Sequence, residues 1–330
     1  MDTKKKSTEE TSSKVRMITV TDEHVGRRLD NFLQSNLKNV PKSLIYKIIR
    51  DGQVRINSGR KKPTYRLCPQ DKVRIPPVHV KSNLKSEIPQ KRLTEIGQSI
   101  IFENEHYLVV DKPSGLASHG GTGVHYGVIE VLRQLRPYST RLDLAHRLDK
   151  ETSGCLLIAK SLRALRSFQL ANNENKVTKR YKALLMGQVP SSLKKIQSNL
   201  DISRGSSGHR QARVSGHGKY ACTIIEKKMP YGSHTLAFLK LETGRMHQIR
   251  AHCLHVGFPI AGDREYGDVD FNVCMRKCGL TRLFLHSFHL SFKTELGLVD
   301  VTTKLPDELT QVLLKIDTLG STENLARYDD

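Results

Sequence analysis

The segment HRLDKETSG, residues 146–154, carries the charged side chains that are best placed to do chemistry. It is a turn-forming stretch directly before the apolar run CLLIAK. A loop that leads into a buried strand places its side chains at the edge of a sheet, so we expect the Asp149 carboxylate at the rim of a cleft. The alternative is that Asp149, Thr152 and Ser153 only organise a turn through side-chain to backbone hydrogen bonds.

Two further segments supply cations and a tyrosine. TGRMHQIRAH, residues 243–252, places Arg245 and Arg250 around the expected start of a helix. An arginine beside a carboxylate lowers the carboxylate pKa and keeps the group ionised, as a nucleophile or base must be. The same segment could instead be a basic helix that binds a polyanion without a catalytic part. Tyr181, in the expected strand YKALLMG, could be a catalytic group or a half-buried packing residue.

Composition excludes several classes of protein. The 330 residues include 54 Lys and Arg against 33 Asp and Glu, a net charge of +21 that is concentrated toward the N-terminus and favours a polyanionic partner. Lysines that only maintain solubility are the alternative. The apolar runs are too short to span a membrane, and the N-terminus lacks the apolar core of a secretory signal. Six irregularly spaced cysteines fit reduced thiols, so we expect a cytoplasmic protein.

The hydrophobic pattern predicts two domains. Helical spacing around residues 29–33 and 44–49, followed by short alternating runs at 54–56 and 73–75, predicts a small α+β unit. The expected division is a disordered tail at 1–16, this unit at 17–77, a polar linker at 78–97, a larger domain at 98–318 and a C-terminal tail at 319–330.

One basic face follows from the first unit. Its members are Arg27, Arg28, Lys42, Lys47, Arg50, Arg55, Arg60, Lys61 and Lys62. Few aromatic residues accompany them, which favours recognition of structured RNA by shape and phosphate contact over base stacking. The segments RRLDNFL, SLIYKIIRDGQVRIN and DKVRIP, in this order, resemble an S4 domain, a small RNA-binding module.

The larger domain is expected to be a mixed, mostly antiparallel α+β fold. CLLIAK, YKALLMG, TLAFLKLE and LFLHSFHLSF are strand candidates, whereas VIEVLRQL, residues 162–170 and HQIRAHCLHVG are helix-like. SRGSSGHRQARVSGHGK, residues 203–219, carries Arg204, Arg210 and Arg213 and is either a flexible basic loop that closes on RNA or a solvated hairpin tip. The apolar spacing at residues 309–316 predicts a helix that packs on this domain.

Together the motifs are similar to those of a known enzyme family. HRLDKETSG, KRYKAL, TGRMHQIRAH followed by GFPIAGD, and RLFLHSFHL resemble the successive motifs of RluA-type pseudouridine synthases. The resemblance implies that a uridine in RNA is converted to pseudouridine by breaking the N-glycosidic bond, rotating the uracil and rejoining it through C5. No metal, nucleotide or other cofactor is required.

The resemblance also implies roles for individual residues. Asp149 is the catalytic carboxylate, acting either by covalent attack or by abstracting a ribose proton, and Arg250 pairs with it. Tyr181 stacks on the base, and Leu285 packs against the uracil. The target base must leave its stack, and Arg147 is the candidate to fill the vacated place. His146, Arg245 and His247 are expected to contact the substrate from the same motifs.

Finer details point to a substrate. KPTYRL, DKVRIPPV and KPSGLASHGGTGVHYGVIEVLR resemble the members of the family that act on large-subunit ribosomal RNA, so we expect 23S ribosomal RNA, free or in an assembling particle. The sequence shows no unexplained apolar stripe or heptad pattern, so we expect a monomer. Two alternatives remain open: a non-catalytic RNA-binding or ribosome-assembly factor, and a synthase acting on transfer RNA. A tyrosyl-tRNA synthetase would also carry an S4-like domain, but it is not favoured, because the HIGH and KMSKS motifs are absent from the sequence.

Metal and nucleotide sites are not favoured either. The cysteines at 274 and 278 lie closer to the histidines at 286 and 289 than in a zinc finger, and those histidines would face opposite sides of a strand. GGTGVHYGV has the wrong glycine spacing for a dinucleotide-binding turn.

Overall fold

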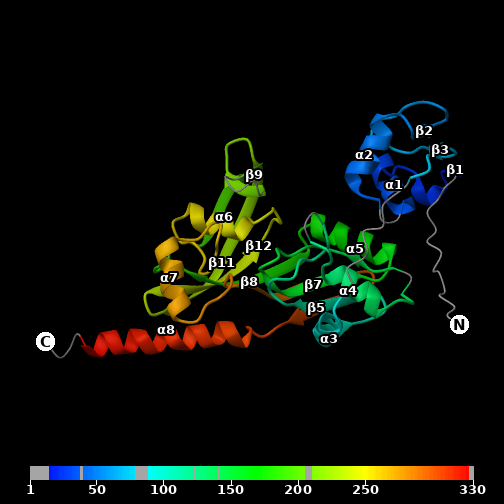
Figure 1. The fold of residues 1–330 in the computed structure, drawn as a ribbon. Helices are drawn as coiled ribbons and strands as arrows, with labels where there is room; N and C mark the ends of the chain where they lie inside the picture. The colour runs from blue at the N-terminus through cyan, green and yellow to red at the C-terminus, as the bar shows by residue number, and fades with distance from the viewer. Residues whose placement is uncertain are drawn as a thin grey trace, which may run out of the picture. The chain divides into compact units, whose positions relative to one another are not determined.

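The computed structural model describes residues 15–37, 40–78, 88–121, 124–139, 141–204 and 210–326, with the side chains of Arg204 and residues 319–326 left aside. The chain divides into two compact units, residues 1–86 and 87–330 (Figure 1). Within the described residues, no helix is both long and apolar enough to cross a membrane.

The first unit is a small α+β domain. Its elements are β1 (Arg16–Thr19), the 3-10 helix η1 (Asp22–His24), α1 (Leu29–Asn36), α2 (Lys42–Arg50), β2 (Arg55–Ile56) and β3 (Lys72–Ile75). The strands form an antiparallel sheet in the order β1-β3-β2. Phe32, Ile45 and Val73 meet in its core. Both predicted helices and both predicted strands are present. Arg16, at the end of the predicted tail, belongs to β1, and residues 1–14 lie outside the described residues.

The second unit is built on a long mixed sheet. Its elements are α3 (Gln90–Gln98), β4 (Ile100–Glu103), β5 (Tyr107–Lys112), α4 (Val128–Leu135), β6 (Asp143–Leu144), β7 (Ser153–Ala159), α5 (Leu162–Asn173), β8 (Val177–Leu185), β9 (Lys195–Arg204), β10 (Arg210–Val214), β11 (Lys219–Tyr231), β12 (His234–Leu241), α6 (Gln248–His255), α7 (Val269–Lys277), β13 (Leu285–Thr294), β14 (Gly297–Thr302) and α8 (Asp307–Ala326). The strand order is β10-β9-β11-β12-β8-β13-β7-β5-β4, with β14 beside β13 and β6 beside β7. Among the described strands every pair is antiparallel except β13–β7, which confirms the predicted mixed, mostly antiparallel α+β class.

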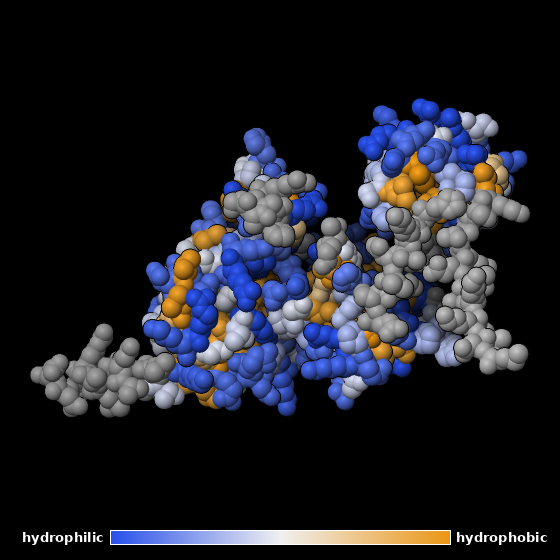
Figure 2. All heavy atoms as spheres, in the orientation of Figure 1, coloured by the Kyte–Doolittle hydropathy of each residue, from blue (hydrophilic) through white to orange (hydrophobic). Residues whose placement is uncertain are grey.

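The central strands are buried on both faces. In β7, Leu156 and Ile158 face a core shared with α3, α4 and α6, while Leu157 faces a second core with α5. This alternation follows from the two-residue period of a strand, and it explains why CLLIAK is apolar throughout. The outer surface seen in Figure 2 is mainly hydrophilic, with hydrophobic side chains in smaller groups.

The predicted linker at 78–97 is wrong in its second half. Residues 90–98 form α3, whose Leu93 and Ile96 are buried in the core of the second unit. Only two apolar residues hold this helix, so its periodicity is too weak to stand out among lysine and glutamine in the sequence.

The structure decides between the two alternatives for residues 203–219. Residues 210–214 form β10, which pairs antiparallel with β9, and this agrees with the hairpin alternative. The predicted tail at 319–330 begins inside α8, which continues to Ala326. The predicted apolar face of that helix is buried: Leu309, Val312, Leu313 and Ile316.

Candidate active site

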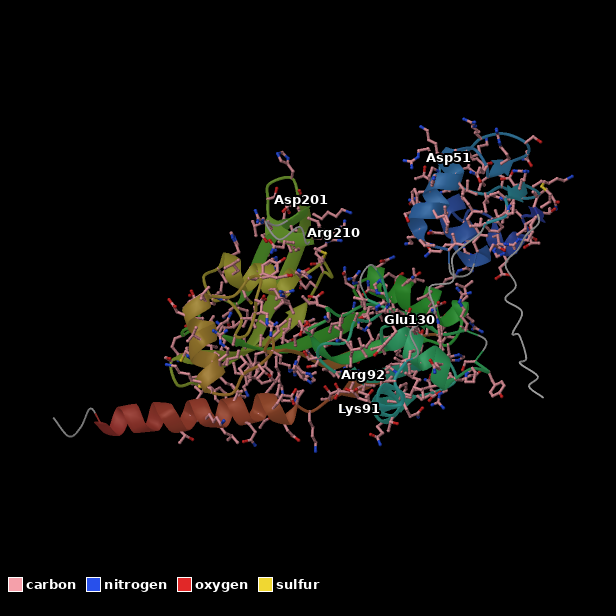
Figure 3. All side chains as sticks on the ribbon, in the orientation of Figure 1. Asp51, Lys91, Arg92, Glu130, Asp201 and Arg210 are labelled. Atoms are coloured by element: carbon pink, nitrogen blue, oxygen red, sulfur yellow. The ribbon has the colours of Figure 1, made fainter. Side chains whose placement is uncertain are left out.

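One cavity of the second unit, of about 720 Å³, brings the predicted active-site residues together. All eight residues predicted as catalytic or substrate-contacting line it: Asp149, Tyr181, Arg250, His146, Arg147, Arg245, His247 and Leu285. They come from the loop before β7, from β8, from the turn leading into α6 with α6 itself, and from β13. Arg210 of β10 also lines the cavity; Figure 3 labels it and Asp201 on the β9–β10 hairpin.

The Asp149 loop is held by the segment KPSGLAS, residues 112–118. Lys112 is fully buried, and its Nζ donates hydrogen bonds to the carbonyl oxygens of Lys150, Leu116 and Pro113 at 3.0, 2.7 and 2.9 Å. Burial lowers the pKa of Lys112 to about 7, but three carbonyl acceptors match the three donors of an ammonium group. The Ser118 hydroxyl donates to Leu148 O and accepts from Leu148 N–H at 2.8 and 3.1 Å. These bonds fix the backbone on both sides of Asp149.

The Asp149 carboxylate faces the cationic side chain of Arg250 and the ring of His247 without being saturated by them. Its Oδ2 lies 3.9 Å from an Arg250 terminal nitrogen, and its Oδ1 lies 3.8 Å from His247 Nε2. Both distances exceed hydrogen-bond length, so the lone pairs of the carboxylate stay available to a substrate. The Asp149 side chain is 21% exposed, which leaves it accessible from the cavity.

Arg250 is fixed by other carboxylates. Its Nε and one terminal nitrogen form a bidentate pair with buried Asp263, each at 2.7 Å, and Glu265 lies 3.2 Å away. Burial alone would lower the pKa of Arg250, but the hydrogen bonds that it donates to Asp263 raise the pKa above its ordinary value. The guanidinium also lies 4.7 Å from the centre of the Tyr266 ring. A permanent charge with a single orientation therefore points toward Asp149.

His247 begins the turn into α6 in an unusual backbone conformation. Its φ of 49° lies in the left-handed region, where a residue other than glycine carries strain. Its Nδ1 lies 3.0 Å from Tyr266 Oη, which already accepts a hydrogen bond from Ala212 N–H at 2.7 Å. Burial lowers the pKa of His247, so the ring is neutral. With the Tyr266 hydroxyl donating to Nδ1, the ring proton sits on Nε2, the nitrogen nearest Asp149, and not on a lone pair that would repel the carboxylate.

The Gln248 side chain holds this turn against the neighbouring strand. Its Oε1 accepts hydrogen bonds from the Thr243 hydroxyl and Arg245 N–H at 2.7 and 3.0 Å. Its Nε2 donates to Cys222 O and Thr223 Oγ1 at 2.9 and 3.0 Å. One buried amide therefore joins the turn to β11.

Tyr181 and Leu285 form the apolar wall of the cavity. Tyr181 lies on β8 between Leu239 of β12 and Ser287 of β13 in the sheet register, and it is 6% exposed. Burial raises the pKa of Tyr181, so its hydroxyl remains protonated at neutral pH. Leu285, on β13, pairs with Ala183. A planar base can pack against such a wall.

The remaining motif residues divide between the interior and the surface. His146 Nε2 accepts a hydrogen bond from Leu157 N–H at 3.2 Å, and burial lowers its pKa to about 3, so it is a neutral packing group at the cavity floor. Arg147 and Arg245 are exposed at the cavity. Arg245 Nε donates to the Tyr220 carbonyl oxygen at 3.1 Å.

The predicted RNA-binding residues of the first unit are at least partly exposed. Arg28 differs from the rest, because it forms a bidentate pair with buried Asp30 at 3.1 and 2.6 Å. Lys61 lies over the Tyr65 ring, 4.8 Å from its centre. Of the three arginines predicted at 203–219, Arg210 and Arg213 are exposed on β10, and Arg204 ends β9 with its side chain outside the described residues.

Four residues that build the site were missed from the sequence. Asp263, Glu265 and Tyr266 stand in GDREYG, which begins with the last two residues of the quoted motif GFPIAGD, and Lys112 stands in the quoted segment KPSGLASH. The sequence signal that could have indicated a role in the site was a lysine or an aspartate inside a motif that also contains glycine and proline. Their partners lie up to 54 residues away for Tyr266, so no spacing rule could assign them.

The arrangement suits chemistry by a single carboxylate. It provides a charged nucleophile or base, a fixed cation, a neutral N–H donor and a hydrophobic wall. Among the described side chains, no three His, Cys, Asp or Glu residues cluster as a metal site would require.

The chain matches two family models. Residues 106–255 match the model described as RNA pseudouridylate synthase, and residues 27–73 match the S4 domain. These ranges include the Asp149 loop, β8 and α6 in the second unit, and α1, α2, β2 and the start of β3 in the first.

Curated relatives cover most of the chain. It is 47% identical to the ribosomal large subunit pseudouridine synthase C of Pasteurella multocida, over 84% of this chain and 86% of the relative. The protein of the same name from Escherichia coli (strain K12) is 44% identical over 84% and 88%. The structure of human RNA pseudouridylate synthase domain containing 4 aligns with a TM-score of 0.56 and 25% identity, covering 68% of this chain and 95% of that one. The chain therefore belongs to the RNA pseudouridylate synthase family and carries an S4 domain.

Proposed function

We propose that this protein isomerises specific uridines of large-subunit ribosomal RNA to pseudouridine, with Asp149 as the catalytic carboxylate. The observation that carries the proposal is the placement of Asp149 between Arg250 and His247, with no hydrogen bond to its carboxylate from the described residues. The names of the curated relatives supply the class of RNA.

The reaction is an internal rearrangement that balances without a co-reactant. The bond between uracil N1 and ribose C1′ breaks, a bond between C5 and C1′ forms, and a proton leaves C5 while N1 gains one. Asp149 either attacks covalently or takes a ribose proton. Arg250 stabilises the ionised carboxylate, and the neutral His247 N–H hydrogen-bonds to the departing uracil or to Asp149.

The apolar wall holds the base while it turns. Tyr181 stacks on the uracil, and Leu285 limits its path. Because burial keeps the Tyr181 phenol protonated, it acts as a packing surface and hydrogen-bond donor, and it removes the C5 proton only if its own proton is passed on. Arg147 occupies the place that the flipped base leaves in the RNA.

The other parts of the chain extend the RNA contact. In this proposal the S4 unit of residues 17–77 binds structured RNA through its basic face, and the exposed arginines of β10 contact the strand near the target. The catalytic domain then begins with α3. The protein acts as a monomer on RNA in the cytoplasm.

The test is Asp149→Asn, assayed on unmodified large-subunit ribosomal RNA by chemical mapping of pseudouridine at single-nucleotide resolution. Removal of the charge should abolish modification at every site, while RNA affinity stays within a few-fold because the shape is retained. Glu151→Gln is the matched control, because it removes an exposed carboxylate two residues away on the same loop and should leave the rate unchanged.

Other outcomes would redirect the proposal. Modification that persists in Asp149→Asn would remove this residue from the catalytic role. Activity on transfer RNA but not on ribosomal RNA would change the substrate. Tight binding to both without any pseudouridine would favour an assembly factor.

A further inference from the structure

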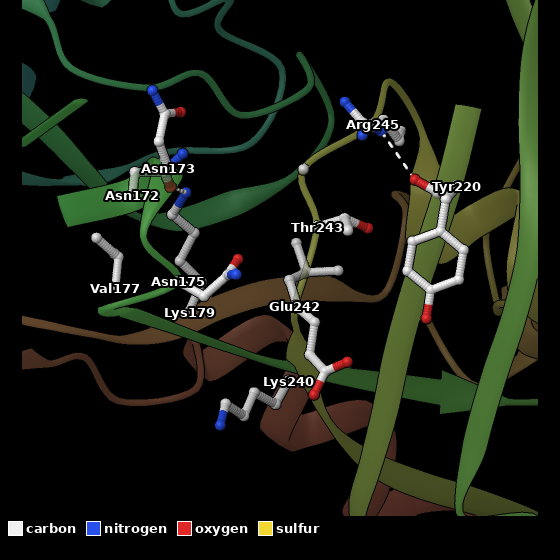
Figure 4. Close-up of a pocket in the computed structure, with 12 residues that line it drawn as sticks. Asn172, Asn173, Asn175, Val177, Lys179, Tyr220, Lys240, Glu242, Thr243 and Arg245 are labelled. Carbon is white, nitrogen blue, oxygen red and sulfur yellow. Dashed lines mark hydrogen bonds between the residues drawn. The ribbon is translucent and has the colours of Figure 1, made fainter. Parts of the chain in front are cut away.

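A second cavity, of about 530 Å³, adjoins the active-site cavity. Figure 4 shows Asn172, Asn173 and Lys179 on one side of it and Thr243 and Arg245 on the other. Six residues line both cavities: Asn172, Asn173, Lys179, Leu241, Gly244 and Arg245. The two cavities therefore share a wall, and a chain that enters one can continue into the other. A volume of this size lies within the range of roughly 300–1,000 Å³ that is typical of ligand pockets.

The lining of this second cavity is positively charged. Lys179, Lys240 and Arg245 contribute three cations, and Glu242 contributes a single carboxylate. Figure 4 shows the Glu242 carboxylate directed toward the Lys240 end, away from Arg245. The end that borders the active site is thus formed by cations and by the amides of Asn172 and Asn173, which suits an anion with polar neighbours.

Lys179 lines this cavity with an ammonium group that no carboxylate among the described residues neutralises. Its Nζ donates one hydrogen bond, to Asn172 Oδ1 at 2.6 Å, and lies 5.7 Å from the centre of the Phe168 ring. An ammonium group has three donors, and within the described part of the chain this one bond is its only hydrogen bond and no carboxylate pairs with it. Two donors and a positive charge therefore remain at the border of the two cavities.

The position of Lys179 is costly without an anion. Burial lowers the pKa of Lys179 to about 8, because the ammonium loses water without gaining an opposite charge. Asn172, at the end of α5, holds the ammonium in place, so it does not swing out to solvent. On the opposite wall Arg245 is held by its bond to the Tyr220 carbonyl oxygen, and among the described residues its terminal nitrogens form no hydrogen bond across the cavity.

We propose that this cavity is a subsite for a phosphodiester group of the RNA strand, one or two nucleotides from the target uridine, bound between Lys179 and Arg245. The inference rests on the proposed function, since it places the strand on both sides of the shared wall. The phosphate takes the free donors of Lys179, and the amides of Asn172 and Asn173 contact the adjoining sugar or base. Fixing the backbone here holds the strand while the uridine is turned into the active site.

The test pairs a protein variant with a change in the RNA. The probe is a short stem-loop around a uridine mapped in the assay above, with a neutral methylphosphonate replacing one phosphate at a time. We measure the dissociation constant and single-turnover rate for wild type, Lys179→Met and the control Lys176→Met. Lys176→Met removes the same charge at a position three residues away. The Lys176 side chain is 66% exposed and forms an ion pair with Glu174 outside both cavities.

One phosphodiester linkage near the target uridine should affect the dissociation constant more than the other linkages do. Its neutralisation should weaken binding of wild type about tenfold, and Lys179→Met should weaken the native RNA by a similar factor. The two changes together should cost no more than either alone, whereas Lys176→Met should respond to every linkage as wild type does. Arg245→Met should couple to the same linkage.

The contrary results are distinct. If wild type is active but every linkage affects Lys179→Met and wild type equally, the subsite is wrong and the proposed function stands. If wild type makes no pseudouridine in any RNA, the proposed function fails and this inference falls with it. Lys179→Met should have the same thermal unfolding temperature as wild type. A change in RNA binding then reports a lost contact and not a loss of the folded structure.

Discussion

Tyr266 links three parts of the site through one hydroxyl group and one ring. The hydroxyl accepts from Ala212 N–H of β10 and bonds to His247 Nδ1, while the ring lies against the Arg250 guanidinium. Tyr266→Phe keeps the ring but leaves the buried Ala212 N–H without its acceptor, so we expect a loss of about 1–2 kcal/mol in the free energy of unfolding. Because His247 also loses the group that sets its proton position, the turnover number should fall about tenfold, with RNA affinity nearly unchanged.

Tyr107→Phe is the control for this prediction. Its hydroxyl donates to the carbonyl oxygen of Ala164 at 3.0 Å, in the core beside α5 and away from the cavity. The free energy of unfolding of Tyr107→Phe should drop by a comparable amount, while its turnover number remains that of wild type. Equal activity of the two variants, measured by single-turnover conversion, would show that Tyr266 only supports the fold.

At the scale of elements, the sequence predicted the parts that the apolar pattern defines. β7, β8, β12, β13, α4, α5 and α6 lie where their segments were expected. The eight motif residues were predicted to form one site, and they line one cavity, because the loop before β7, the turn into α6, β8 and β13 meet there. Two features could not be predicted. Helix α3 has only two buried apolar residues among polar ones, and the pair of Asp263 with Arg250 depends on how α6 and the following turn pack.

Gly154, the last residue of HRLDKETSG, shows how a motif residue can serve the sheet. It pairs with Ser287 where β7 and β13 run parallel, with a φ of 110°. A Cβ there would overlap the Ser287 backbone, so Gly154→Ala must push β7 from β13 and displace the Asp149 loop. We expect a loss of at least about 3 kcal/mol in the free energy of unfolding and little remaining activity.

Gly297→Ala separates the two causes of that loss. Gly297 has nearly the same φ, 113°, but a Cβ there would meet nothing within 4 Å. Backbone strain alone should therefore cost about 1–3 kcal/mol and leave the catalytic rate unchanged. The free energies of unfolding of the two variants are compared by urea unfolding, monitored by circular dichroism. Equal losses would mean that the close approach of β7 to β13 does not matter.

At the scale of the whole molecule, the second unit depends on buried histidines that are neutral in the fold. Burial lowers the pKa of His146 and of His286 to about 3, and that of His252 to about 4. The His286 nitrogens lie 2.9 and 2.7 Å from the hydroxyls of Ser153 and Thr303, and His252 Nδ1 lies 3.0 Å from Thr223 Oγ1. Each ring therefore takes up its proton more readily in the unfolded chain, where the histidine pKa is about 6.5.

This difference makes stability depend on pH below 6.5. Between pH 6 and 5 the unfolded chain binds about three more protons at these histidines than the folded protein does. Asp111 opposes them by one proton, because burial raises its pKa to about 6, so its carboxyl is protonated first in the fold. With two net protons at about 1.4 kcal/mol each per pH unit, the free energy of unfolding should fall by roughly 2–3 kcal/mol from pH 6 to pH 5.

Urea unfolding at intervals between pH 7.5 and 4.5 measures that slope, and His286→Gln assigns a share of it. Glutamine has no titration in this range, so the variant should lose one proton's worth of slope, about 1.4 kcal/mol per pH unit, whatever its stability at pH 7.5. His289→Gln is the control, because His289 lies on the same strand and pairs with the exposed side chain of Asp300. A variant His286→Gln with the slope of wild type would mean that His286 binds its proton equally in both states, and that neutral buried histidines do not set the acid limit of the fold.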